Sequence, residues 1–141
     1  SKRSITMVDQ QKFVKALNPC DSPRRFAFVL IESFSLLSFA SALDALRIAN
    51  RMAEYPLYNW ILLGETDSSV MCSAGTSFRV DYDLIELKRD DTIFLCGGMD
   101  IQKNTSKRLL NWLRREARKG LSIAGLFIEG KKMHEIFPGI S

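Results

Sequence analysis

The side chains of this chain that could bind or react with a small molecule stand directly after apolar segments. Glu32 follows one apolar run, and Cys96 closes another just before Gly97 and Gly98. A carboxylate can act as a base or neutralise a cationic ligand, and a thiol can act as a nucleophile. Adjacent glycines can adopt positive φ and present backbone N–H groups to an anion. The pattern is compatible with a catalytic site and with a binding pocket.

Each of these residues also has a simpler structural explanation. A glycine pair after a strand is most often a tight turn, and Glu32 could be a solvated loop carboxylate. Cys96 stands inside an apolar run, where a buried, inert thiol is more usual than a nucleophile. His134, the single histidine of the sequence, has no partner nearby in the chain and is not expected to be catalytic.

Composition excludes several classes of site. Three widely spaced cysteines and one histidine provide no zinc-binding cluster, so no metal is expected. Neither GxGxxG nor GxxxxGK[ST] occurs, and no cofactor is expected. The basic N-terminus lacks the apolar core of a signal peptide, and no apolar run approaches the roughly 20 residues of a membrane helix. With 141 residues, 46% apolar and 26% charged, we expect a one-domain cytoplasmic protein with no membrane partner.

Alternating strands and helices are expected to position these side chains. Apolar runs of strand length occur at 25–31, 58–64, 92–96 and 121–128, with short strand pieces near Val70 and 78–80 around a turn at Ala74-Gly75. Helical spacing of apolar residues covers 36–55, with Ser35 as N-cap, and 104–120, which ends at Gly120. The order predicts an α/β fold with a parallel sheet. The first run is apolar throughout, which indicates a central strand buried on both faces.

Ligands of open parallel sheets bind beyond the carboxyl ends of the strands. The loops after the runs at 25–31, 92–96 and 121–128 should therefore converge on one pocket, with Glu32 neutralising a cationic ligand and two glycines donating N–H groups. Two aromatic rings would form apolar or cation–π walls. The predicted ligand-binding residues are Glu32, Ser33, Phe34, Gly97, Gly98, Met99 and Phe127.

The basic helix at 104–120 suggests a different hypothesis, a direct DNA-binding module. Its cations could meet phosphates. They circle much of the outer surface, however, and Glu116 interrupts them. Cations in the last turn also favour the helix dipole. A solvated helix face explains the pattern more simply. The basic residues concerned are Lys107, Arg108, Arg114, Arg115, Arg118 and Lys119.

Three blocks of the sequence carry a resemblance to a known family. "FAFVLIESFSLLSFASALDALRIAN", "DDTIFLCGGMD" and "LLNWLRREARKGLSIAGL" resemble the N-terminal domain of GlxA-type transcription regulators of the AraC family, from about Arg25 to Leu126. That domain belongs to the PfpI-like, class I glutamine-amidotransferase-like superfamily. The resemblance implies a flavodoxin-like sheet with helices on both faces.

The resemblance also implies partners. It implies a domain that senses a small effector, amino-acid or amine-like, from amino-acid or quaternary-amine catabolism, and that forms a homodimer. DNA would be bound only through a C-terminal helix-turn-helix domain that this sequence does not contain.

The same resemblance implies that catalysis is absent. Enzymes of the superfamily carry a cysteine nucleophile where Phe127 aligns and a glutamate where Ser38 aligns, and neither replacement can do that chemistry. The alternative is a hydrolase or amidase that uses Cys96, the one thiol at a strand end.

The family pattern is lost after Leu126, in "FIEGKKMHEIFPGIS". We expect a flexible tail at 1–24, with at most a short helix near 10–17, a sensing and dimerisation domain at 25–128, and a divergent tail at 129–141. Truncation, divergence or a frameshift would each account for this end. The sheet is expected to be incomplete at the C-terminus, and its uncovered apolar surface should drive homo-oligomerisation.

Overall fold

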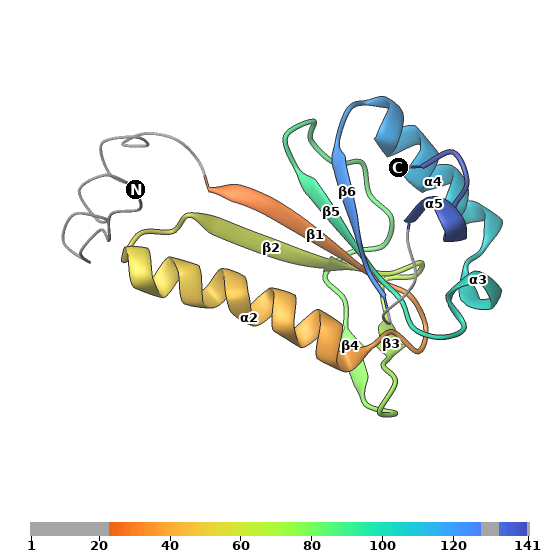
Figure 1. Ribbon diagram of the computed structural model, residues 1–141, viewed down its shortest axis with the longest axis horizontal. Coiled ribbons are helices and arrows are strands. Elements are labelled where there is room, and N and C mark those ends of the chain that lie inside the picture. The colour runs from red at the N-terminus through yellow and green to blue at the C-terminus, as the bar shows by residue number, and fades with distance from the viewer. Residues whose placement is uncertain (1–22, 128–132, 141) are drawn as a thin grey trace, which may run out of the picture.

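A four-stranded parallel sheet forms the centre of the molecule (Figure 1). The computed structural model describes residues 23–127 and 133–140, and the short helix expected near 10–17 lies outside them. The strand order is β2-β1-β5-β6, and every neighbouring pair is parallel. This confirms the predicted α/β fold. The strands are β1 (Arg24–Leu30), β2 (Tyr58–Leu63), β5 (Thr92–Cys96) and β6 (Ser122–Leu126).

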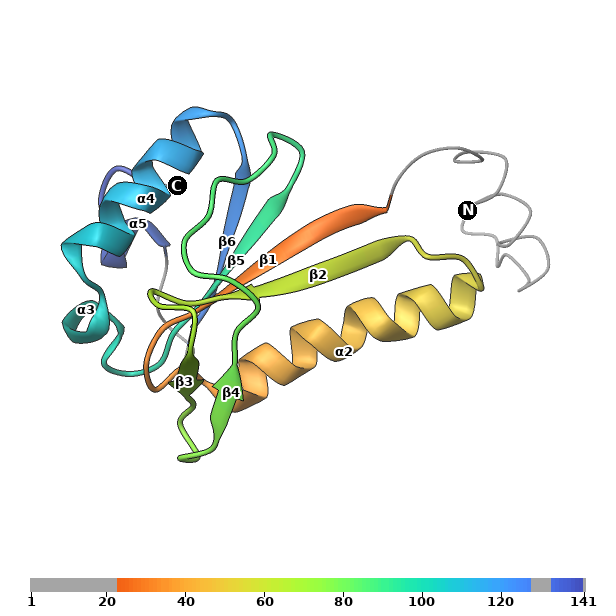
Figure 2. The same ribbon diagram turned by 180° about the vertical axis from the view of Figure 1, so that it is seen from behind.

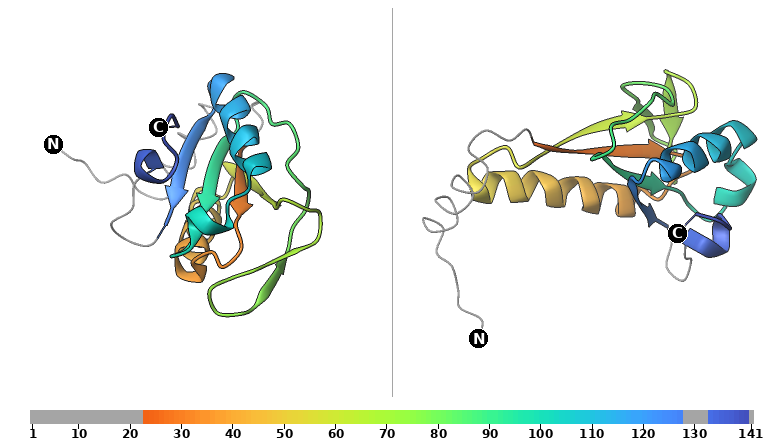
Figure 3. Two further views of the ribbon diagram at one scale, coloured as in Figure 1. Left: turned by 90° about the vertical axis from the view of Figure 1, so that its right-hand side faces the viewer. Right: turned by 90° about the horizontal axis from the view of Figure 1, so that it is seen from above.

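Helices cover both faces of the sheet, as expected. The long helix α2 (Leu36–Ala53) runs beneath β1 and β2, and α4 (Lys107–Arg118) lies on the opposite face (Figure 3). Ser35 and Ser106 cap the two helices, because each hydroxyl accepts a backbone N–H three residues ahead. Within the described ranges, no helix is long and apolar enough to cross a membrane.

Alternation along the strands divides the core into two layers. From β1, Ala27 and Val29 point to the layer that contains α4, whereas Phe28 and Leu30 point to the layer under α2. All four are almost completely buried. Their burial on both faces explains why the strand is apolar from Phe26 onward. Aromatic rings, which pack edge-on or tilted against one another, dominate the α2 layer.

A small antiparallel hairpin folds back beside the first turn of α2 (Figure 2). It consists of β3 (Ser69–Met71) and β4 (Ser77–Arg79), close to where the sequence predicted short strands. Gly75 has a φ of +82° at the expected turn, where a side chain would be strained. The hairpin joins the α2 layer through Val70 and Phe78.

The helix expected at 104–120 is interrupted near its start. A short α3 (Ile101–Asn104) precedes α4, and Thr105 between them has an extended backbone. The N-cap at Ser106 then restarts the helix. Likewise, α2 ends at Ala53 rather than 55, because Glu54 takes a left-handed conformation.

Part of the predicted C-terminal tail belongs to the core. At the end of α5 (Met133–Ile136) and just after it, the side chains of Ile136, Phe137 and Ile140 are buried in the same cluster as α4 and β6. The boundary predicted at residue 128 is therefore not the end of the packed structure. Apolar residues of this segment cover a part of the sheet that was expected to be exposed.

Candidate functional site at the carboxyl edge of the sheet

The loops after β1, β5 and β6 meet at one edge. The N–H of Ile31 donates to the carbonyl of Cys96 at 3.0 Å, and the N–H of Gly97 donates to the carbonyl of Leu126 at 3.2 Å. The N–H of Ser35 donates to the carbonyl of Gly97 at 3.0 Å and ties the entry of α2 to the same place. The strand ends thus converge as the parallel sheet predicted.

Ser33 adopts a backbone conformation that is unusual for a residue with a side chain. Its φ is +67°, in the left-handed region that costs a non-glycine residue on the order of 1 kcal/mol. Its N–H donates to the carbonyl of Met71 in the hairpin at 2.7 Å, which holds the loop in this conformation. Such residues concentrate at functional sites, so Ser33 marks this loop as a candidate.

The backbone conformation and hydrogen bonding of Gly97 and Gly98 differ from those expected. Neither Gly97 nor Gly98 has a positive φ, and the N–H of Gly97 is already used by Leu126. Gly97 is required by space, since a Cβ there would lie 2.2 Å from Cδ1 of Ile101. The N–H of Gly98 has no hydrogen-bond partner among the described residues. Gly98 is therefore the one of the two whose N–H is uncommitted, although the residue itself is buried.

The two aromatic residues of the predicted pocket take different positions. Phe34 is 0% exposed and packs edge-on against Phe39 and Phe78, with ring centroids 5.4 and 5.6 Å apart. It is a core residue and cannot be a pocket wall as predicted. Phe127 is half-buried. Its ring lies over Gly125, where a Cβ would come within 2.1 Å of it, and packs toward the α4 layer.

Three members of the predicted set are exposed: Ser33, described above, and the side chains of Glu32 and Met99. The Glu32 carboxylate is exposed, while its backbone carbonyl accepts a hydrogen bond from Nδ2 of Asn104 at 3.1 Å. The Met99 side chain is 79% exposed. Both residues can therefore reach a ligand at this edge.

Cys96 is not available as a nucleophile. It is 1% exposed, and its Sγ donates to the carbonyl of Phe94 at 3.7 Å. Burial raises its pKa far above the usual range of a thiol, so the reactive thiolate does not form near neutral pH. This agrees with the expectation of a buried, inert thiol.

A group of serine side chains surrounds the start of α2. The Ser35 hydroxyl lies 3.1 Å from that of Ser38, and the Ser73 hydroxyl accepts the N–H of Leu36 at 3.2 Å. Sequence reasoning missed Ser73, because only the folding back of the hairpin brings it here. Within residues 23–127 and 133–140, no three His, Cys, Asp or Glu side chains gather as metal ligands. The edge thus offers the Glu32 carboxylate, hydroxyls and the uncommitted N–H of Gly98.

Sequence comparison relates the chain to transcriptional regulators. It is 35% identical over 101 residues to the HTH-type transcriptional regulator CdhR of Pseudomonas aeruginosa, covering 72% of this chain and 30% of that protein. It is 34% identical over 104 residues to the HTH-type transcriptional regulator GlxA of Rhizobium meliloti, covering 73% and 32%. The chain therefore spans about a third of the length of these relatives. No protein-family profile matches it.

Solved structures with a similar fold agree with this relationship. An AraC family transcriptional regulator from Pseudomonas putida superposes with a TM-score of 0.65 at 28% identity, covering 73% of this chain and 64% of that one. A ThiJ/PfpI family protein from Pseudomonas syringae superposes with a TM-score of 0.59 at 14% identity, covering 78% and 45%. The second likeness concerns the fold alone.

Proposed function

Because the chain is homologous to a segment of GlxA-type transcriptional regulators of the AraC family and has a PfpI-like fold, we propose that it is the effector-sensing and dimerisation part of such a regulator and has no catalytic activity. The effector is a small amino acid or amine-like cation. DNA is contacted by a helix-turn-helix region outside this sequence, and the protein acts in the cytoplasm.

The observation that carries the proposal is a carboxyl edge with binding groups but no nucleophile. Phe127 follows β6 at the turn where a reactive side chain would stand, and the two described thiols, Cys96 at the end of β5 and Cys72 directly after β3, are buried. Glu32 presents an exposed carboxylate, and Gly98 retains a free N–H among the described residues. A cation with a nearby carboxylate or carbonyl would satisfy both groups.

Dimerisation is proposed through the outer surface of α2. Leu37, Ile48 and Met52 are 77%, 44% and 47% exposed, and at about 100° per residue they fall on one stripe of the helix. Leu37 and Met52 are equally distant from the middle of α2, where Asp44 and Arg47 form an exposed ion pair. A twofold axis at that point would place Leu37 against the partner subunit's Met52, and each Asp44 near the partner subunit's Arg47.

A thermal-shift screen with amines, amino acids and betaines tests the sensing role, because a ligand that binds the folded state raises the melting temperature. A selective, saturable rise with one chemical class supports the proposal. If none of these compounds raises the melting temperature of the chain, the cationic-effector proposal is rejected.

A further inference from the structure

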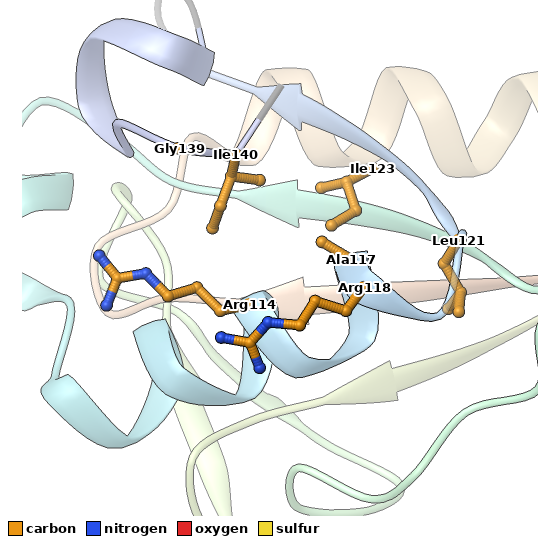
Figure 4. Close-up of a pocket in the computed structure, with 7 residues that line it drawn as sticks. All are labelled: Arg114, Ala117, Arg118, Leu121, Ile123, Gly139 and Ile140. Carbon is orange, nitrogen blue, oxygen red and sulfur yellow. The ribbon is translucent and has the colours of Figure 1, made fainter.

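Two arginines on α4 have no partner in the described fold. Arg114 and Arg118 are one turn apart, and their side chains extend to the same side of the helix (Figure 4). Within residues 23–127 and 133–140, neither guanidinium makes a hydrogen bond or an ion pair. Other cations of this helix are engaged: Lys119 binds the buried carboxylate of Glu116 at 2.8 Å, and Arg108 lies 4.0 Å from the Asp83 carboxylate.

Both arginines line a cavity of about 380 Å³. The cavity lies between α4, the start of β6 and the C-terminal segment (Figure 4). Gly139, with a φ of +91°, turns the chain so that Ile140 packs inward at 2% exposure. Among the described residues, the remaining walls are uncharged and no acidic side chain takes part in them. They are formed by Ala117, Leu121, Ile123, Gly139 and Ile140.

The lining residues indicate which class of ligand this cavity would bind. Guanidinium groups bind carboxylates through paired, charge-assisted hydrogen bonds, and two of them one turn apart can share one anion. Ala117 and Ile123, which are partly exposed, can pack against a short hydrocarbon body. The volume lies near the lower end of small-molecule sites, which span about 300–1,000 Å³. We propose that this cavity binds a short aliphatic carboxylate, with its anionic group on Arg114 and Arg118.

The helix dipole does not account for the arrangement. Cations near the last turn are favourable on any side of a helix, and Arg115 satisfies that rule while lining a neighbouring cavity with Glu116 and Lys119, which Arg118 also borders. The dipole gives no reason for two unpaired guanidiniums to share a cavity with apolar walls.

The site is separate from the carboxyl edge. Leu121 immediately precedes β6, so the cavity lies toward the amino end of that strand, whereas the effector pocket proposed above lies beyond its carboxyl end. If one site fails to bind its ligand, the proposal for the other site still stands.

A ligand here would also act on the C-terminal segment. It would contact α4 on one side and Ile140 on the other, so binding should favour the docked state of that segment. The amide of Ile140, which donates to the carbonyl of Phe137 at 3.0 Å, reports this docking. Slower hydrogen exchange at that amide with ligand present is the expected signature.

The test uses three probes of related shape. 3-Methylbutanoate has the charge and the hydrocarbon body, acetate has the charge with almost no body, and 3-methyl-1-butanol has the body without the charge. We expect saturable amide shifts around Ala117, Ile123 and Ile140 with 3-methylbutanoate alone. For about seven non-hydrogen atoms, the dissociation constant should be on the order of a millimolar.

Substitutions then distinguish binding in the cavity from a general attraction to the positive charge of the helix. Arg114→Gln and Arg118→Gln should each weaken binding about tenfold, because each removes a charge-assisted hydrogen bond. Arg115→Gln removes the same charge from the same helix and should leave the affinity unchanged. Unchanged melting temperatures establish that all three variants are folded.

Three results overturn the proposal. The first is an absence of saturable binding of 3-methylbutanoate to the unsubstituted chain. The second is equal binding of acetate, or an equal loss in Arg115→Gln, which would mean attraction to general positive charge. The third is equal binding of 3-methyl-1-butanol, which would mean an apolar crevice in which the arginines have no role.

Discussion

The backbone carbonyl oxygen of Ser33 lies where any side chain on Gly98 would have to begin: a Cβ at position 98 would stand 2.3 Å from it. The loops after β1 and β5 thus approach each other backbone to backbone. Ser33 is also held in the left-handed region, so neither loop can retreat without losing that local geometry. This contact fixes the distance between the two halves of the candidate effector site.

Gly98→Ala should therefore disturb both stability and effector binding. The obstructing atom belongs to the backbone and cannot rotate away, so the loops must separate at a cost of about 1–3 kcal/mol. Urea unfolding measures the loss. Met99→Ala, at the adjacent exposed position, should change the unfolding free energy by less than about 0.5 kcal/mol. Equal effects of the two substitutions would mean that the close approach is unimportant.

Asp91 should be essential to the amino edge of the sheet. Its carboxylate is 4% exposed and accepts hydrogen bonds from Nε and Nη2 of Arg25 at 3.2 and 2.6 Å and from the N–H of Lys88 at 2.8 Å. Asp91→Ala should cost about 2–4 kcal/mol, since it leaves these donors unpaired. Asp90→Ala, the exposed neighbour, is the matched control in urea unfolding, and a comparable cost there would contradict this assignment.

The same ion pair determines how the titration of Arg25 affects the stability of the fold. The hydrogen bond with Asp91 raises the pKa of the Arg25 guanidinium. A cation with a raised pKa stabilises the fold at every pH below its unfolded pKa and loses that effect only as the pH rises through its folded pKa. Titration of Arg25 therefore contributes no pH dependence to stability in the acid or neutral range.

The strands and their convergence could be predicted because they follow from local patterns. β1 is apolar from Phe26 onward since both of its faces are covered there, and glycines follow β5 since its loop packs closely on Ser33 and Ile101. Contacts between segments far apart in the sequence could not be predicted in this way. Ser73 reaches α2 only because the hairpin folds back.

The position of Phe34 in the chain was predicted correctly, but its role was not. It does follow β1, but the left-handed turn at Ser33 redirects the chain, and the ring enters the aromatic layer instead of the open edge. Ile136 and Ile140 were missed for a related reason: they are too few to form a periodic pattern, and only α4 and β6 provide a surface that buries them.

Cys96 should resist alkylation in the folded protein. Its burial and raised pKa keep the thiolate fraction and its accessibility low, so labelling by iodoacetamide at neutral pH should be at least about a hundredfold slower than in urea. Mass spectrometry of the Cys96 peptide measures the rate. Fast labelling of the native chain would reopen the hydrolase hypothesis, and Cys96→Ser would then have to abolish any hydrolase activity.

Glu32→Gln should weaken the response to a cationic effector. The substitution removes the exposed carboxylate at the carboxyl edge but retains the shape of the side chain. The thermal shift produced by the best compound of the amine and betaine screen should fall, with an affinity loss of about tenfold. Glu54→Gln removes the same charge at the far end of α2. A loss of equal size in that control would indicate a long-range charge effect instead of a contact.

Ile48→Glu should dissociate the proposed dimer. The side chain lies at 44% exposure in the middle of the apolar stripe of α2, so a carboxylate there would be buried against apolar groups of a second copy. Sedimentation equilibrium should show a monomer for this variant and a dimer for the unsubstituted chain. Tyr82→Glu adds the same charge at another exposed apolar residue, outside α2, and should remain dimeric. If the unsubstituted chain is monomeric at micromolar concentration, the stripe is not a homodimer interface; if both variants dissociate, net charge and not the stripe controls assembly.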